Sequence, residues 1–246
     1  MGLSLASNHG QRSRFLVRRF CEAQLEQLRH LLHDLLPPVV AAAMINISAR
    51  PPPENCHAAV LQLDICGFTD LSQTITPMQL ALLMHKLFTY FDDTVYANGL
   101  FKMDTVGDAY IVAALLPDGD LQRTFACHGM LAVAKSMIRG LERHHQETGQ
   151  RVQCRIGVAV GEVTTGVLGH LQTRFHITGP GLQAAELMEQ TAPVKDSLHA
   201  SDTFIDALRQ PGGELDLPEW IVLTPSDDTQ GTSLALAPCE LARSAV

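Results

Sequence analysis

The sequence predicts an α+β domain in which helices pack on one face of an antiparallel, ferredoxin-like sheet. Two observations carry this prediction: the order of the strand-like and helical segments, and the clarity of the signals that begin and end them. In chain order the segments follow a β-α-β-β-α-β pattern, which places the first strand beside the central hairpin. The segments are a strand at 58–64, a helix after residue 77, two strands within 99–115, a helix at 121–146 and strands within 152–169.

The first half of this pattern has strong local signals. Apolar residues alternate through Leu61–Ile65, which predicts a strand that ends before a glycine. Thr76 is a good N-cap and Pro77 suits a first helical turn, so a long helix is expected to begin there. The two strands that follow are joined at Val106–Gly107, and this junction predicts a hairpin.

The second half is assigned from periodicity and from turn residues. Residues 121–146 are predicted to form the second long helix, and 152–169 are interpreted as another strand pair. Residues 181–191 and 201–209 are expected to form short helices. Beyond them, 219–223 is a single expected strand in an otherwise uninformative tail.

A helical segment precedes this domain. From Arg14 to Leu36, apolar residues follow a 4,3,4,3 spacing, which is the seam of a short parallel coiled coil. An amphipathic helix packed on its own domain explains the same spacing, and both interpretations stay open. Pro37 and Pro38 are expected to interrupt the helix. We therefore divide the chain into an N-terminal helix with its linker (1–50), a compact domain (51–210) and a C-terminal extension (211–246).

Composition excludes several classes of protein. A net charge of −8 in 246 residues argues against a nucleic-acid binder that relies on a basic face. The six cysteines are widely scattered, which excludes a local zinc motif and fits reduced, intracellular thiols. No apolar run reaches 18 residues, so this stretch is not expected to cross a membrane.

Two acidic residues interrupt apolar strands at the same predicted edge of the sheet. Asp64 lies near the end of the first strand, and Asp108 follows the glycine of the hairpin turn. Two carboxylates so close would repel each other unless divalent cations lie between them, and the carbonyl of Ile65 is a further oxygen ligand. This set suits two Mg²⁺ or Mn²⁺ ions and phosphoryl chemistry. The other interpretation, that both acids are turn residues facing water, also stays open.

The residues after Asp64 favour a phosphate ligand. "CGFT" offers backbone N–H groups of Gly67, Phe68 and Thr69 at the start of a helix, where orphan donors attract anions.

At this point the sequence resembles the class III nucleotidyl cyclase family. The matching motifs occur in the family's order over about residues 30–210: "LDICGFTDLSQTITPMQL", "KMDTVGDAYIVAALLP", "RIGVAVGEVTTGVLG" and "RFHITG". The resemblance implies that Asp64 and Asp108 bind two metals with the Ile65 carbonyl, and that Arg155 contacts the triphosphate. It also implies a lyase that converts GTP or ATP to the 3′,5′-cyclic nucleotide and pyrophosphate, at sites shared between two such domains. The segment "LLHDLLPPVVAAAM" resembles the signalling helix that precedes many guanylyl cyclase domains.

The sequence departs from the family where the transition state is stabilised. Active members carry Asn and, four residues later, Arg; this chain has Gln183 and Leu187. Leucine cannot stabilise negative charge, so a homodimer is expected to be nearly silent. At the positions that read the purine, Asp104 keeps an acidic character that favours guanine, whereas His176 matches neither the adenylyl nor the guanylyl pattern.

The combination resembles the metal-donating half of a heterodimeric cyclase, such as the α subunit of soluble guanylyl cyclase. The expected partners are GTP, or ATP, and a second cyclase domain, supplied by another chain or in tandem. The expected location is the cytoplasm, as a domain of a larger chain that a membrane segment elsewhere could anchor. The alternative is a catalytically silent pseudo-cyclase that serves as a regulatory dimerisation or nucleotide-binding module.

Overall fold

The structure is a computed structural model. It describes residues 15–28, 32, 35–47, 51–116, 120–169, 174–209, 221–224 and 232–236. The chain divides into two compact units, residues 1–52 with 166–175, and residues 53–165 with 176–246.

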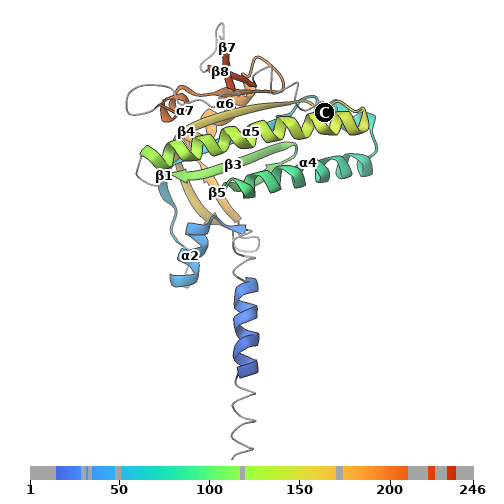
Figure 1. The fold of residues 1–246 in the computed structure, drawn as a ribbon. Helices are drawn as coiled ribbons and strands as arrows, with labels where there is room; N and C mark the ends of the chain where they lie inside the picture. Colours follow the sequence, from blue (N-terminus) through green and yellow to red (C-terminus); the bar gives the residue numbers. More distant parts are fainter. Residues whose placement is uncertain are drawn as a thin grey trace, which may run out of the picture. The chain divides into compact units, whose positions relative to one another are not determined.

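The first unit contains the N-terminal helical segment (Figure 1). A helix covers residues 15–28, and Leu25 and Leu28 of the predicted seam are exposed. The chain bends at Leu36, so the predicted interruption at the two prolines is confirmed. A second helix, α2 (Pro38–Ile47), then begins at Pro38, within the segment that resembles the signalling helix. Proline is well accommodated at a first helical turn because its missing N–H has no partner there. The coiled coil stays a prediction.

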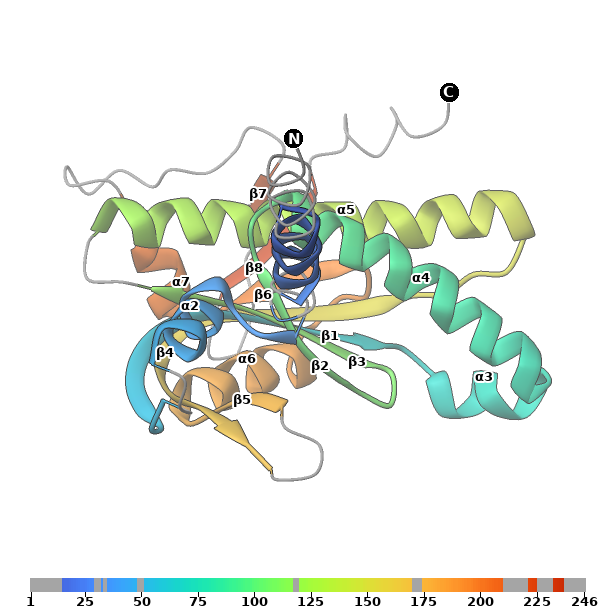
Figure 2. The same ribbon diagram turned by 90° about the horizontal axis from the view of Figure 1, so that it is seen from below.

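The second unit is built on a mostly antiparallel sheet with the strand order β2-β3-β1-β4-β6-β8-β7, and β5 pairs with β4; the strands are labelled in Figure 2. Its β2-β3-β1-β4 part is the ferredoxin-like core that the segment order predicts. The strands are β1 (Glu54–Ile65), β2 (Phe101–Val106), β3 (Ala109–Leu116), β4 (Cys154–Leu168), β5 (Arg174–Thr178), β6 (Ser197–Ala200), β7 (Ile221–Thr224) and β8 (Thr232–Leu236).

Helices cover both faces of this sheet, which corrects the expectation of one covered face. The long helices α4 (Pro77–Ala97) and α5 (Asp120–Thr148) lie on one face, and α6 (Pro180–Gln190) lies on the other (Figure 2). The short helix α3 (Phe68–Thr74) follows β1, and α7 (Asp202–Ala207) contacts α5 through the bond from the Thr124 hydroxyl to the Ala207 carbonyl. Residues 156–160 of β4 are all buried, as expected of a strand that is covered on both sides.

The start of α4 forms as predicted. The Thr76 hydroxyl accepts a hydrogen bond from the Gln79 N–H, and the Gln79 side chain accepts one from the Thr76 N–H. This reciprocal capping box satisfies donors that the first helical turn would otherwise leave unpaired.

A side-chain cluster fastens the β2–β3 hairpin to α4. The rings of Phe91 and Tyr110 meet edge to face at 5.5 Å, and the Tyr110 hydroxyl donates to Asp92. The ammonium of Lys102 on β2 lies 2.8 Å from Asp92 and 5.0 Å from the centre of the Tyr110 ring. An aromatic pair of this kind contributes about 0.5–1.5 kcal/mol beyond its buried area. The cluster therefore fixes the strands that enter and leave the Gly107–Asp108 turn.

The strand β4 corrects a second expectation. The segment 152–169 forms one strand of 15 residues rather than a strand pair. Its internal glycines do not turn the chain; they let α6 approach. A Cβ added to Gly157 would lie 2.2 Å from the Ala185 carbonyl oxygen and 2.2 Å from the Glu189 N–H nitrogen, and one added to Gly161 would lie 2.8 Å from the Gly181 Cα. Glycine in a strand interior often marks such a close approach of another backbone.

At the end of the unit, the strand expected at 219–223 is confirmed for residues 221–223, which lie in β7, while 219–220 are outside the described residues; β8 was not predicted. In the described part of the chain, no helix has both the length and the apolar character needed to span a bilayer.

Candidate active site

The two acids that the sequence singles out lie side by side. The β1–β3 ladder ends at the pair Leu63–Tyr110, directly before Asp64 on one strand and the Gly107–Asp108 turn beside the other. Burial raises the pKa of Asp108, and the negative charge of Asp64 raises it further. The hairpin thus brings the two carboxylates within electrostatic range of each other.

This donor set fits Mg²⁺ or Mn²⁺ better than zinc. Among the described residues, no cluster of three or more His, Cys, Asp or Glu side chains could hold a metal ion, so a closed zinc site is excluded there. Mg²⁺ instead keeps several waters and binds through one or two carboxylates together with substrate phosphates. Asp64, Asp108 and the carbonyl of Ile65, the last residue of β1, supply that kind of set. A cation would also relieve the repulsion that raises the pKa of Asp108.

Arg155 lies beside this pair and bridges two acids. It is the register partner of Asp64 across the β1–β4 ladder, and its Nη2 lies 3.2 Å from Asp64 Oδ2. Its Nε lies 2.8 Å from Oε1 of Glu189, a residue in the last turn of α6. The Glu189 side chain is only 4% exposed, against 34% for Arg155. Burial raises the pKa of Glu189, and the charge of Arg155 offsets part of that rise.

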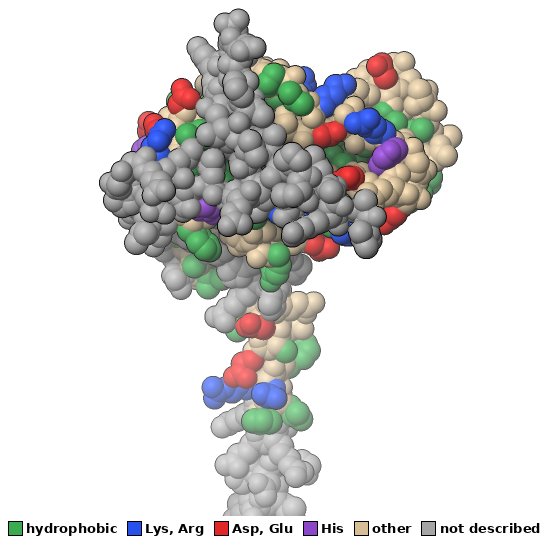
Figure 3. Space-filling model, turned by 45° about the horizontal axis from the view of Figure 1, so that its top comes forward, with side chains coloured by type: hydrophobic (Ala, Val, Ile, Leu, Met, Phe, Trp, Pro, Cys, Tyr) green, Lys and Arg blue, Asp and Glu red, His purple; other side chains and the backbone are tan. Residues whose placement is uncertain are grey.

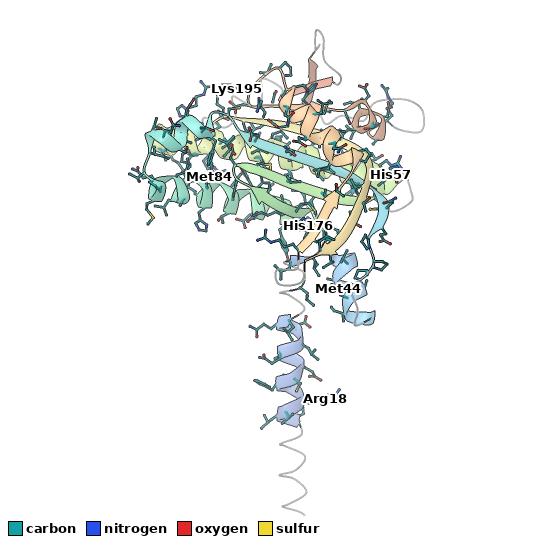
Figure 4. All side chains as sticks on the ribbon, turned by 180° about the vertical axis from the view of Figure 1, so that it is seen from behind. Arg18, Met44, His57, Met84, His176 and Lys195 are labelled. Atoms are coloured by element: carbon teal, nitrogen blue, oxygen red, sulfur yellow. The ribbon has the colours of Figure 1, made fainter. Side chains whose placement is uncertain are left out.

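Two cationic side chains, Arg155 and Lys195, lie within electrostatic range of the turn after β1. Gly67 has a φ of +70° and precedes α3, which begins at Phe68, and the Cys66 N–H donates to the Gln153 carbonyl. Burial raises the pKa of the Cys66 thiol, while the charges of Arg155 and Lys195 lower it. Lys195 is exposed in the loop between α6 and β6 (Figure 4). Sequence reasoning missed both Lys195 and Glu189, because neither belongs to a recognisable motif.

The two residues predicted to replace the transition-state Asn and Arg, Gln183 and Leu187, face away from this cluster within one chain. On α6 the buried residues include Ala185, Met188 and Glu189, whereas Gln183 and Leu187 are exposed one turn apart on the opposite face. Leu187 is 41% exposed. The outer face of α6 is therefore available to another surface.

The two purine-reading positions are placed only in part. Asp104 lies on β2, between Lys102 and Thr105, where the β2–β3 register shifts; its side chain is outside the described residues. His176 is exposed on β5 (Figure 4). Both stay predictions.

Charges on the described surface are mixed. In the view of Figure 3, acidic and basic side chains are interspersed, and no continuous basic stripe crosses the part of that face that is described.

The fold and this acidic edge define a nucleotide cyclase domain, and comparison with known proteins identifies the family. A family model of the adenylate and guanylate cyclase catalytic domain matches residues 52–223, so the chain belongs to this family. A curated relative, the receptor-type guanylate cyclase gcy-28 of Caenorhabditis elegans, is 31% identical over 196 residues, which are 78% of this chain and 15% of the relative. The chain thus spans less than a fifth of the length of that protein.

Two solved structures share the fold. One is the guanylate cyclase domain of RhGC from Catenaria anguillulae in complex with GTP, with 23% identity and a TM-score of 0.60, covering 74% of this chain and 96% of that one. The other is a non-canonical dimeric guanylyl cyclase domain of the RhoGC fusion protein from Blastocladiella emersonii, also with 23% identity and a TM-score of 0.60, covering 74% of this chain and 94% of that one.

Proposed function

We propose that this chain is the metal-donating half of a dimeric nucleotide cyclase that forms a 3′,5′-cyclic nucleotide, preferably cGMP, and pyrophosphate. One observation carries the proposal: Asp64, Asp108 and Arg155 lie together at one edge, while the outer face of α6 presents Gln183 and Leu187. Such a chain has the acids and the arginine that would hold a metal-bound triphosphate, but it lacks the Asn and Arg that would stabilise the transition state.

Each residue of the acidic edge has a distinct task. Asp64, Asp108 and the Ile65 carbonyl would hold two divalent cations. When bound, these cations activate the 3′-hydroxyl and neutralise charge on the phosphates. Arg155 would exchange Asp64 for the triphosphate, because a guanidinium binds phosphate through several parallel N–H donors. The N–H groups of Gly67, Phe68 and Thr69 would add neutral donors beside it.

The missing step is stabilisation of the charge that develops at the α-phosphate. In a symmetric dimer, each site would take its aspartates from one chain and the face of α6 with Gln183 and Leu187 from the other. Leucine donates no hydrogen bond, and losing one such electrostatic contact typically costs about 10²–10³ in rate. Full activity therefore requires a partner domain with Asn and Arg at these positions. A fungal cyclase domain of this fold forms a non-canonical dimer, which supports dimerisation of the fold but not this particular pairing.

The nucleotide and the wider context are inferred from relatives. Complex formation with GTP by the fungal domain and the guanylate cyclase activity named for gcy-28 favour GTP, and the acidic Asp104 agrees with this. We assign residues 51–210 to the catalytic domain, 1–50 to a helix and linker that align the partner, and 211–246 to an extension. The domain would act in the cytoplasm as part of a longer signalling chain.

A pseudo-cyclase is the second candidate, and Leu187 is the observation that favours it. Such a protein would bind a partner, or a nucleotide, without turnover. Intact metal and phosphate groups favour the enzyme half, because a pure dimerisation module has no need of two adjacent carboxylates that repel each other.

Metal-dependent nucleotide binding tests the proposal. With Mn²⁺ and GTP at about 100 times the dissociation constant, binding should stabilise the fold by about 2.7 kcal/mol, or roughly 5–10 °C in melting temperature. Asp108→Asn should abolish this gain. Asp93→Asn, which removes the same charge from the exposed surface of α4, should keep it. Equal melting temperatures of the wild type with and without Mn²⁺ and GTP would count against the site.

A further inference from the structure

Glu189 is buried beneath Arg155 and is not among the groups that would bind the metals or the triphosphate directly. Glu189 is one of the few buried charged residues among those described, and it lies 2.8 Å from the Nε of Arg155. Burying a carboxylate costs free energy unless it is paired, so Arg155 and Glu189 stabilise each other.

The last turn of α6, which carries Glu189, is held firmly on the sheet. Gly157 has no side chain, so the Glu189 backbone lies close against β4, two residues beyond Arg155. The ring Nδ1 of the fully buried His199, the register partner of Gly157, lies 3.1 Å from the Met188 carbonyl oxygen. The Glu189 carboxylate is therefore presented to Arg155 from a fixed piece of backbone.

The two contacts of Arg155 use different edges of its guanidinium. Glu189 faces Nε, while Asp64 faces Nη2. The Nε–Oε1 contact is an ion pair without hydrogen-bond geometry, so Glu189 holds the rigid plane of the guanidinium in place by charge. Among the described residues, the acids paired with Arg155 are Glu189 and Asp64, so without Glu189 a tighter Arg155–Asp64 pair would compete with both the metal and the triphosphate.

We propose that Glu189 is a positioning residue for nucleotide binding: its carboxylate pairs with the Arg155 guanidinium and holds it so that its N–H donors face the triphosphate. This inference rests on the proposed function, because it requires that Arg155 binds the triphosphate. Because Glu189 belongs to α6, the inference also links nucleotide binding by one chain to the position of the helix whose outer face would contact the partner.

Simple electrostatics makes the opposite prediction. A carboxylate near a triphosphate repels it, so removing the charge of Glu189 should strengthen triphosphate binding if charge alone mattered. Positioning predicts weaker binding when either the charge or the reach of the side chain is lost. The sign of the change in affinity therefore separates the two accounts.

The experiment compares two variants with a matched control. Glu189→Gln removes the charge and keeps the shape, and Glu189→Asp keeps the charge and shortens the side chain by one methylene. Glu186→Gln removes the same charge from the exposed face of the same helix. Affinities for GTP and for GMP are measured by calorimetry with Mn²⁺, because GMP lacks the phosphates that Arg155 would contact. The single variant Arg155→Ala and the double variant Arg155→Ala with Glu189→Gln complete a double-mutant cycle.

We expect both Glu189 variants to bind GTP about tenfold more weakly, the lower end of the range for residues that orient a ligand-binding group. GMP affinity and the Glu186→Gln control should be unchanged. Arg155→Ala should weaken GTP binding about 10–100-fold, and adding Glu189→Gln should then change nothing further. If Glu189→Gln does not fold, Glu189→Asp, which keeps the negative charge, decides the question alone.

Three results would overturn the inference: unchanged or tighter GTP binding by both Glu189 variants, an equal loss for GMP, or an undiminished loss in the Arg155→Ala background. In each of these the wild type still binds GTP, so the proposed function survives. Failure of the wild type to bind GTP with Mn²⁺ would instead remove the proposed function, and this inference with it.

Discussion

Replacing Gly157 by alanine should disturb the packing of α6 on β4, because among the described glycines this is the one at which an added Cβ comes closest to another atom. The added Cβ would lie 2.2 Å from two backbone atoms of α6, whereas ordinary contacts begin at 3.4 Å. A flexible side chain could turn aside, but the Ala185 carbonyl and the Glu189 N–H belong to a helix, so α6 must move by about 1 Å. Overpacking of a core typically costs 1–3 kcal/mol, and we expect about 3 kcal/mol because both close atoms are backbone. For a domain of this size the melting temperature should fall by about 6–12 °C.

Gly129→Ala is the control for this prediction. Gly129 lies within α5, and its added Cβ would be 3.6 Å from the Leu100 side chain, an ordinary contact. Alanine is favoured over glycine in a helix by about 0.8–1 kcal/mol, so this variant should melt about 2–4 °C higher. Differential scanning calorimetry of both proteins measures the two shifts. Equal melting temperatures for Gly157→Ala and the wild type would refute the close approach of α6 to β4 on which the placement of Glu189 depends.

Two further predictions concern charge. Burial raises the pKa of Asp108, and the negative charge of Asp64 raises it further, so the ionised form of Asp108 is disfavoured in the folded chain. Asp108→Asn should therefore raise the melting temperature of the metal-free protein at pH 7. A lower melting temperature would show that the two carboxylates do not repel each other. Burial lowers the pKa of His144, and the charge of Lys86 lowers it further. The unfolded chain therefore binds a proton at His144 more readily than the folded chain does, and the free energy of unfolding falls as the pH drops below about 6.5. His144→Gln should flatten the fall in stability between about pH 6.5 and 5 in urea titrations, and an unchanged slope would contradict the assignment.

Much of the fold follows from local signals in the sequence. The capping residues around Thr76 begin α4 where expected, and Gly107, with a φ of +67°, makes the hairpin turn. Once the hairpin lies beside β1, the proximity of Asp64 and Asp108 follows from strand register alone. These features depend on a few neighbouring residues, so a single sequence is enough to predict them.

The features that sequence reasoning missed depend on contacts between distant segments. Glycines in 152–169 resemble turn residues, and only the position of α6 shows that Gly157 and Gly161 admit a helix. Glu189 resembles a solvent-facing acid on an amphipathic helix, since glutamate is rarely buried. Its burial follows from the pairing with Arg155, which lies 34 positions earlier in the chain. The placement of Lys195 near Cys66 likewise comes from the loop that joins α6 to β6.

The central claim, that this chain is half of a working active site, is tested most directly by supplying the missing groups. The double variant Gln183→Asn with Leu187→Arg places an amide and a guanidinium on the exposed face of α6. With Mn²⁺ and GTP, the purified dimer should form cyclic nucleotide at least about 10²-fold faster than the wild type.

Adding Asp108→Asn to the double variant should abolish this gain, because the metal-binding carboxylate is then lost. Circular dichroism and sedimentation establish that each variant is folded and dimeric before its rate is measured. A folded, dimeric double variant that stays inactive on both GTP and ATP would contradict the account and leave the pseudo-cyclase as the better explanation.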